Sequence, residues 1–262
     1  MCGICGLIDN ASGAISRDKI QAMTDKMTHR GPDNRGIYIN LESSPKVGLG
    51  HRRLSIIDLS SQGTQPMANE DESIRLVLNG EIYNYKTLRE ELKNKGHIFR
   101  SNTDAEVAVH LYEEHKEECV KYLRGMFAFA IWDQKKRTLF IARDRAGQKP
   151  LLYYHKDRRF VFASEFTSIL ESGLIEKKIS YEAMHHYLTF GYIPAPLTIY
   201  EDIFKLPPAH TLTLEDEKAT LRRYWNLDYS AKIKISEEDA ATEVMRYLKD
   251  AVNIRLYSDV PL

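Results

Sequence analysis

Met126-Phe127-Ala128-Phe129-Ala130-Ile131-Trp132 is an apolar run of strand length, and two more such runs follow it at residues 138–142 and 159–163. All three are rich in β-branched and aromatic residues and are separated by charged turns, which is typical of consecutive antiparallel strands. Helical periodicity occurs before them at residues 17–27, 85–95 and 104–115. Several strands in meander order with helices around them predict an α+β fold, in which two packed antiparallel sheets carry helical layers outside.

The remaining segments extend this arrangement toward both ends of the chain. Residues 47–54 and 74–79 read as strands that lead into polar loops, and residues 210–214 and 219–225 predict a hairpin. Ser236-Glu237-Glu238-Asp239 is a capping box that opens a predicted helix over residues 236–257, with one apolar face. We therefore expect one domain over residues 2–225, followed at 226–262 by a linker and the first helix of a second domain.

Composition excludes several classes of function. The 262 residues include 37 lysines plus arginines and 37 aspartates plus glutamates, so the net charge gives no support to a nucleic-acid partner. No apolar run approaches the roughly 20 residues of a membrane span, and no signal-like segment opens the chain. Three cysteines do not form an even disulfide framework, so the sequence predicts a cytoplasmic protein with no membrane partner.

Cys2 would become the N-terminal residue once Met1 is removed, which places a thiol and an α-amine on one residue. A thiol with its ordinary pKa of about 8.5 is only a few per cent thiolate at neutral pH, whereas an α-amine titrates at about 7.7–8.0. The amine can therefore act as general base for the thiol, directly or through one water. Position alone favours a cysteine without a catalytic role, so other residues must decide.

The pair Cys2-x-x-Cys5 also fits a redox pair or half of a zinc site. Zinc needs four ligands, but the only other cysteine is the isolated Cys119 and the nine histidines include no helical H-x-x-x-H pair, so no metal site is predicted. A redox pair normally opens a helix, whereas residues 5–8 are typical of a strand, in which residues three apart face opposite sides. Cys5 is therefore expected to be a small core residue.

Three further positions offer the chemistry that an amide-cleaving thiol requires. Asn79 and Gly80 supply a side-chain amide and a backbone N–H that can converge on one oxyanion, although Asn-Gly is also a common hairpin turn. Arg53 can bind a carboxylate in a bidentate manner, and Asp104 can accept a hydrogen bond from an ammonium group. Together they suit the head group of an α-amino acid; singly, Arg53 also fits a surface charge and Asp104 an N-cap.

Several motifs occur in the order seen in one enzyme family: Cys2-Gly3-Ile4, Arg30-Gly31-Pro32-Asp33, Arg53-Leu54-Ser55-Ile56-Ile57-Asp58, Asn79-Gly80-Glu81-Ile82-Tyr83-Asn84, Thr103-Asp104-Ala105-Glu106, Gly125-Met126-Phe127-Ala128-Phe129-Ala130 and Arg143-Asp144. The chain resembles the class II glutamine amidotransferases, and in particular the N-terminal part of glutamine-hydrolysing asparagine synthetases. Shorter matches at residues 147–151, 163–165, 191–196 and 206–208 extend the resemblance over essentially the whole of residues 2–262.

The resemblance implies an N-terminal-nucleophile hydrolase fold, a four-layer αββα sandwich, whose substrate is L-glutamine. It implies that Cys2 forms a γ-glutamyl thioester and releases ammonia, while Asn79 and the Gly80 N–H hold the oxyanion. Arg53 would bind the glutamine carboxylate, and Glu81 and Asp104 would hold its α-amino group. The backbone of Arg53, Leu54, Ser55, Ile56 and Ile57 would line the pocket. Arg30 and Asp33 are expected to give structural support.

In the resembling family an ATP-dependent synthetase domain or subunit receives the ammonia and amidates aspartate. The glycine-rich pyrophosphate loop of that domain is absent here, so this chain is expected to need no cofactor, with ATP and magnesium serving only the missing domain. Two alternatives stay open: a non-catalytic glutamine-sensing or regulatory domain, and an amidotransferase domain that serves another acceptor. A homodimer also stays open.

Overall fold

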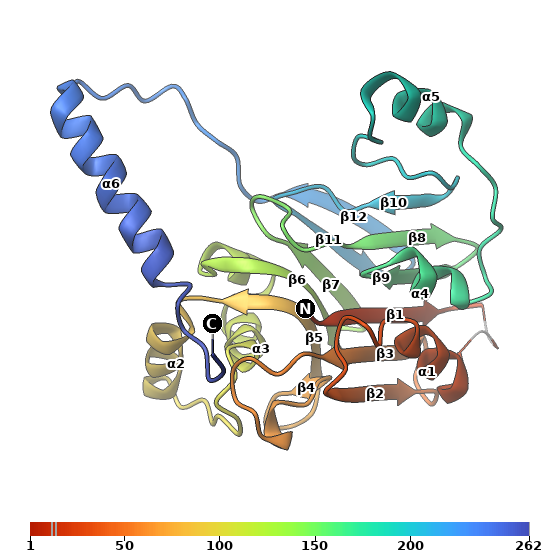
Figure 1. Ribbon diagram of the computed structural model, residues 1–262. Coiled ribbons are helices and arrows are strands. Elements are labelled where there is room, and N and C mark those ends of the chain that lie inside the picture. Colours follow the sequence, from red (N-terminus) through yellow and green to blue (C-terminus); the bar gives the residue numbers. More distant parts are fainter. Residues whose placement is uncertain (12, 14, 262) are drawn as a thin grey trace.

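The computed structural model describes residues 1–11, 13 and 15–261, and Leu262, the last residue of the predicted second-domain segment, lies outside them. Two six-stranded antiparallel sheets lie face to face (Figure 1). The first sheet has the order β10 (Ile203–Lys205), β8 (Leu152–Lys156), β9 (Arg159–Ala163), β1 (Gly3–Asp9), β3 (Lys46–Arg53) and β2 (Asn34–Asn40). The second has the order β12 (Lys218–Arg223), β11 (His210–Glu215), β7 (Thr138–Arg143), β6 (Gly125–Asp133), β5 (Ile74–Ile82) and β4 (Met67–Ala68).

Strand β1 lies in the interior of the first sheet, and every one of its residues is buried. It pairs with β3 on one side and β9 on the other, in the register Gly3 to Arg52 and Cys5 to Ala163. Alternate side chains point to opposite faces of a strand, so Ile4 packs between the sheets while Cys5 packs on the outer helical side. This burial on both faces fixes the backbone immediately after Cys2.

Strand β6, which carries the apolar run 126–132, has the same role in the second sheet. Phe127, Phe129 and Ile131 belong to the outer core under the helices, whereas Ala128 and Trp132 lie in the core between the sheets. All five side chains are at most 2% exposed. The continuous apolar sequence therefore reflects a strand buried on both faces, as expected for an inner layer of a sandwich.

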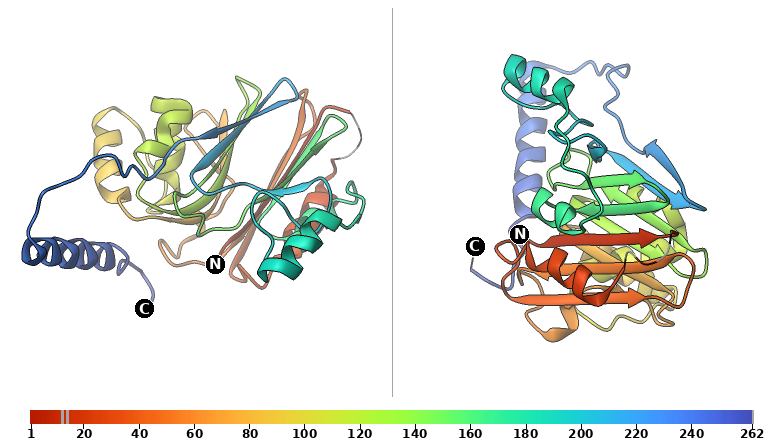
Figure 2. Two further views of the ribbon diagram at one scale, coloured as in Figure 1. Left: turned by 90° about the horizontal axis from the view of Figure 1, so that it is seen from above. Right: turned by 90° about the vertical axis from the view of Figure 1, so that its right-hand side faces the viewer.

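Helices cover the outer face of each sheet (Figures 1 and 2). On the first sheet lie α1 (Arg17–Asp25) and α4 (Phe166–Glu171), and on the second lie α2 (Tyr85–Asn94) and α3 (Ala105–His115). The Ser16 hydroxyl caps α1 by accepting a hydrogen bond from the Lys19 N–H at 3.2 Å. Helix, sheet, sheet and helix form the four predicted layers, so the αββα prediction is confirmed.

The structure also contains elements that the hydrophobic pattern did not predict: β2, β4, β8, β10, α4, the 3-10 helices Ser61–Gly63 and Lys116–Lys121, and α5 (Tyr181–Phe190). Strand β2 lies at a sheet edge and has no fully buried residue, so its sequence carries no clear apolar run. The helix predicted at residues 236–257 is shorter in the structure: α6 (Glu237–Asn253) ends at Asn253, and a turn follows at residues 254 and 255.

Helix α6 stands away from the two sheets, at the end of an extended segment (Figures 1 and 2). None of its residues is buried, and its apolar residues Val244, Tyr247 and Leu248 are each more than half exposed. The predicted capping box is present, because the Ser236 hydroxyl accepts a hydrogen bond from the Asp239 N–H at 3.1 Å. Within the described residues, no helix combines the length and the apolar character that crossing a bilayer requires.

Candidate active site

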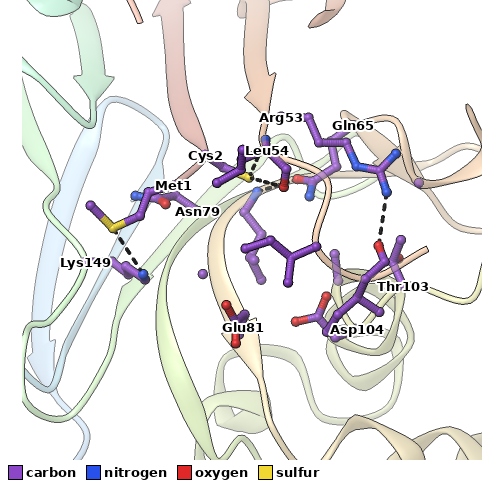
Figure 3. Close-up of a pocket in the computed structure, with 16 residues that line it drawn as sticks. Met1, Cys2, Arg53, Leu54, Gln65, Asn79, Glu81, Thr103, Asp104 and Lys149 are labelled. Carbon is purple, nitrogen blue, oxygen red and sulfur yellow. Dashed lines mark hydrogen bonds between the residues drawn. The ribbon is translucent and has the colours of Figure 1, made fainter. Parts of the chain in front are cut away.

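A narrow pocket lies where the start of β1, the end of β3, the middle of β5 and the N-terminus of α3 meet (Figure 3). Nine of its lining residues were predicted from the sequence: Cys2, Arg53, Leu54, Ile56, Ile57, Asn79, Gly80, Glu81 and Asp104. Ser55 is the predicted residue that does not line the pocket. Its N–H donates to the Asp33 carboxylate at 2.7 Å, which orders the loop from outside.

The Cys2 thiol lies at the mouth of this pocket, against the backbone of β3. The Leu54 N–H donates to Sγ at 3.5 Å, and Sγ lies 3.8 Å from the Leu54 carbonyl oxygen. The Arg30 guanidinium donates to the Cys2 carbonyl at 2.9 Å and forms an ion pair with Glu165, also at 2.9 Å. Burial raises the pKa of the Cys2 thiol, although the Leu54 hydrogen bond and the nearby amino terminus oppose the rise. The thiol therefore needs a base.

Asn79 and Gly80 lie inside strand β5 rather than in a hairpin turn, because they pair with Ala128 and Phe127 of β6. Asn79 is completely buried, and neither its Oδ1 nor its Nδ2 has a hydrogen-bond partner within the described part of the chain. A Cβ on residue 80 would lie 2.1 Å from the Met126 carbonyl oxygen, so only glycine fits here. The strand thus holds an unused amide donor at the pocket wall.

The Arg53 side chain is 5% exposed and is bound by the loop that follows β3. Its guanidinium donates to the carbonyl oxygens of Ser60 at 2.8 Å and Ile57 at 3.1 Å, and also to that of Asp58. A guanidinium has five N–H groups, so these three bonds leave two for another acceptor. Arg53 therefore shapes the pocket loop in this structure and is not a free surface charge.

Glu81 and Asp104 lie together on the side of the pocket away from Cys2 (Figure 3). Asp104 occupies the position before α3, but its carboxylate does not cap that helix; it accepts a hydrogen bond from the Ile82 N–H at 2.7 Å. Burial raises the pKa of Asp104 to about 6, and the Glu81 charge adds to the rise while the Ile82 bond opposes it. Two neighbouring carboxylates that are partly shielded from water repel each other, so a bound cationic group stabilises the charged form of both.

Sequence reasoning missed several lining residues: Met1, Gly63, Gln65, Leu78, Thr103, Ala105 and Lys149. Lys149 lies close to both Cys2 and Glu81, and its ammonium donates to the Met1 sulfur at 3.4 Å. Burial lowers the pKa of Lys149, and the Glu81 charge opposes the effect. The segment 147–151 matches a family motif, but a lysine in a loop after a strand carries no sequence signal for a pocket.

Cys5 lies outside this pocket. Its sulfur is fully buried on the side of α1, 3.4 Å from the Thr24 hydroxyl oxygen, and Cys2 and Cys5 are both free thiols. The two cysteines are separated by the strand itself, which is the arrangement expected for residues three apart in a β-strand. This geometry argues against a redox pair and is that of a core cysteine.

The comparisons with known proteins agree with the fold and extend it. Residues 1–225 match the model of the glutamine amidotransferase domain family. The chain is 37% identical to glutamine-hydrolyzing asparagine synthetase 3 of Bacillus subtilis over 266 residues, which cover 100% of this chain and 42% of that protein. It is 34% identical to amidase chry2 of Gibberella zeae over 276 residues, which cover 100% of this chain and 40% of that protein.

A solved structure of glutamine phosphoribosylpyrophosphate amidotransferase from Bacillus subtilis superposes with a TM-score of 0.62 at 20% identity, covering 86% of this chain and 49% of that one. At that identity the likeness concerns the fold alone, and it supports the N-terminal-nucleophile hydrolase sandwich. The chain spans less than half the length of the two curated relatives described above. The family match over most of the chain and the shared fold show that this protein belongs to the glutamine amidotransferase domain family, of the type found in asparagine synthetases.

Proposed function

We propose that this chain hydrolyses L-glutamine to glutamate and ammonia, with Cys2 as the nucleophile. The observation that carries the proposal is the convergence on one pocket of a thiol, an unpartnered buried amide and two carboxylates, the buried Asp104 and the partly buried Glu81. Glutamine fits these features: its side-chain carboxamide suits the thiol and the amide, and its α-ammonium group, at the other end of a short chain, suits the carboxylates.

The first step requires Met1 to be removed, so that the α-amine of Cys2 becomes free. That amine takes the proton of the Cys2 thiol as Sγ attacks the side-chain amide carbon and a C–S bond forms. The proton is then delivered to the leaving nitrogen as the C–N bond breaks, and ammonia departs. The Leu54 N–H, which lies 3.5 Å from Sγ, holds the sulfur in place during the attack.

The negative charge that develops on the amide oxygen is stabilised by the Asn79 side-chain amide and the Gly80 N–H. Both belong to β5, which pairs with β6 along its whole length, so the donors are positioned before the substrate arrives. Water then attacks the γ-glutamyl thioester through the same oxyanion geometry. The α-amine takes a proton from this water, the thioester C–S bond breaks, glutamate leaves, and the α-amine returns the proton to the thiolate.

The amino-acid head group is bound by residues on the side of the pocket away from Cys2. The carboxylates of Glu81 and Asp104 accept hydrogen bonds from the α-ammonium group, and the charged form of each carboxylate is restored by that contact. Arg53 offers its two remaining N–H groups to the α-carboxylate while it keeps its bonds to the loop at residues 57–60. The pocket loop and the substrate are then held by the same guanidinium.

The ammonia acceptor lies outside this chain. Similarity to an asparagine synthetase supports an ATP- and magnesium-dependent synthetase domain or subunit that amidates aspartate. Similarity to an amidase supports the alternative of another acceptor. The two are distinguished by adding candidate acceptors with ATP to the full-length protein and identifying the amidated product.

The proposal is tested by mass spectrometry of the purified chain before and after treatment with 6-diazo-5-oxo-norleucine, a glutamine-analogue electrophile. Loss of Met1 and a single adduct on Cys2 are expected, and the buried thiols of Cys5 and Cys119 serve as internal controls because both are 0% exposed. The Cys2→Ala variant should release no ammonia from glutamine. An unprocessed and unlabelled chain that still binds glutamine would instead support the sensing function.

A further inference from the structure

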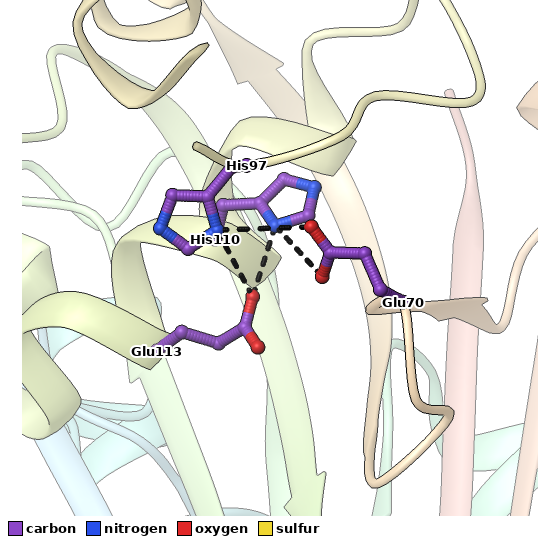
Figure 4. Close-up of side chains that lie close together, drawn as sticks. All are labelled: Glu70, His97, His110 and Glu113. Atoms are coloured by element: carbon purple, nitrogen blue, oxygen red, sulfur yellow. Dashed lines mark hydrogen bonds and ion pairs between the residues drawn. The ribbon is translucent and has the colours of Figure 1, made fainter. Parts of the chain in front are cut away.

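A second group of titratable side chains lies together beside α3 (Figure 4), and none of them lines the glutamine pocket. It consists of Glu70, in the turn after β4, His97, after the end of α2, and His110 and Glu113 on α3. The last two are three residues apart and therefore share one face of the helix. One ligand atom from each of the four lies within 4.8 Å of the others.

Four distances between histidine nitrogens and glutamate oxygens of this cluster are close to the edges of a small tetrahedron. His110 Nδ1 lies 2.9 Å from Glu113 Oε2 and 3.7 Å from Glu70 Oε2. His97 Nδ1 lies 3.5 Å from Glu113 Oε2 and 3.9 Å from Glu70 Oε1. Four ligand atoms at about 2.0–2.1 Å from a zinc ion are separated by about 3.3–3.4 Å. The four observed distances bracket that value, and all four ligand atoms lie within 4.8 Å of one another, so side-chain movements would bring them around one ion.

The groups behind these four side chains are those that support a metal site. His97 Nε2 lies 3.2 Å from Glu114, and such a carboxylate partner fixes the tautomer that leaves Nδ1 free to bind a metal. His110 Nε2 lies 3.9 Å from Glu106 and makes no hydrogen bond within the described residues.

The two ligand carboxylates are oriented in the same way by groups outside the cluster. The Asn69 side-chain amide donates to Glu113 Oε1 at 2.8 Å, which leaves Oε2 directed at the histidines. The Ile98 N–H donates to Glu70 Oε1 at 2.8 Å. Three of the four candidate ligands, His97, Glu70 and Glu113, are therefore held by hydrogen bonds from outside the cluster before any ion arrives.

We propose that Glu70, His97, His110 and Glu113 bind a divalent transition metal ion of the zinc type. Two neutral imidazoles and two carboxylates neutralise the ion's charge, and the set of nitrogen and oxygen ligands suits zinc. With four protein ligands the site is closed, which is typical of a structural site. The side chains range from 1% exposed at His110 to 31% at Glu70, so an ion can enter from the Glu70 side.

A metal ion here would tie three separate segments together. It would join the turn after β4 and the segment after α2 to α3, whose first residues follow the pocket residue Asp104. The consequence is greater stability of this outer layer. The site would act on the architecture around the glutamine pocket without taking part in the chemistry at Cys2.

The experiment is a zinc titration of the chelator-treated protein, followed by calorimetry and thermal unfolding. The chain carries the Cys2→Ala substitution, so that the accessible thiol does not compete for the metal. One zinc ion per chain should bind. The unfolding temperature should rise by about 5 °C or more when zinc is 100-fold above its dissociation constant. Cobalt should give the intense visible absorption of a tetrahedral site.

Two variants and one control decide the outcome. His97→Ala and Glu70→Gln should each weaken zinc binding at least tenfold, and the amide oxygen introduced by Glu70→Gln can still accept the Ile98 hydrogen bond in the metal-free fold. His185→Ala, on the exposed face of α5, should bind zinc as tightly as the parent. Zinc binding that is unchanged in both variants, or the absence of a stoichiometric site in the parent, would overturn the proposal and leave the cluster as a hydrogen-bonded network.

Discussion

The Asn79→Ala substitution tests whether the side-chain amide of Asn79 acts in catalysis or only in the stability of the fold. The substitution removes a side chain that is completely buried, and within the described residues its two polar atoms make no hydrogen bond. No hydrogen bond that stabilises the fold is therefore lost. If Asn79 donates to the oxyanion, its loss should reduce kcat for glutamine hydrolysis by about 10²–10³, which corresponds to about 2.7–4 kcal/mol of transition-state stabilisation.

The expected effect on folding is small because two terms oppose each other. An unpaired buried amide costs about 1–3 kcal/mol, and the substitution relieves that cost. The cavity that replaces the amide costs an amount of similar size. The net change should stay within about 1 kcal/mol, which shifts the unfolding temperature by no more than about 4 °C in a chain of this length.

The assay measures glutamate release at several glutamine concentrations, together with thermal unfolding of each variant. Asn69→Ala is the matched control, because Asn69 is also buried at 3% exposure but its amide is fully used: Oδ1 accepts from Ile74 N–H at 3.0 Å and Nδ2 donates to Glu113 at 2.8 Å. It should lose stability and keep kcat. An Asn79→Ala variant with unchanged kcat and a lowered unfolding temperature would refute the oxyanion assignment.

Three further outcomes are expected. Asp104 must be ionised to bind the α-ammonium group, so KM for glutamine should rise as pH falls through about 6, the raised pKa of this carboxyl; in Asp104→Asn, KM should be high and nearly independent of pH between about 5 and 8. Gly80→Ala places a Cβ 2.1 Å from the Met126 carbonyl oxygen, so chemical denaturation should show a loss of at least about 1–3 kcal/mol, and a variant of unchanged stability would contradict the close approach. Asp259 accepts a hydrogen bond from Asp58 N–H at 2.7 Å, so Asp259→Ala should speed amide hydrogen exchange at residues 56–58; unchanged exchange would show that the loop is held without it.

The layers of the fold could be predicted because their signals are local. Residues 126–132 are apolar on both faces since β6 is buried on both, and residues 17–25 show the helical spacing of a helix that covers one sheet. The edge strand β2 and the helix α5 carried no such signal, because neither buries a full apolar face. Prediction succeeded where burial gives the sequence a periodic or a continuous apolar pattern, and it failed where an element buries too few apolar residues to show one.

The residues of the proposed site also include some that could be predicted from the sequence and some that could not. Cys2, Asn79, Gly80 and Asp104 could be named because their chemistry is specific and their motifs occur in a known order. Their convergence is reported by the structure; their catalytic roles remain predictions. Lys149 was missed as a pocket residue, because a lysine after a strand has many ordinary uses.

The sequence by itself determined the main buried strands and the helices that cover them, the N-terminal thiol motif and the family to which the chain is similar, since each depends on residues close together in the chain. Only the tertiary structure decided that Asn79 is an unpartnered amide inside a strand and that Arg53 is held by the pocket loop. It also decided that His97 and His110, which have no metal-binding spacing, lie in one cluster with Glu70 and Glu113. These are relations between side chains from separate elements, and strand pairing and helix packing, rather than sequence spacing, set the distances between them.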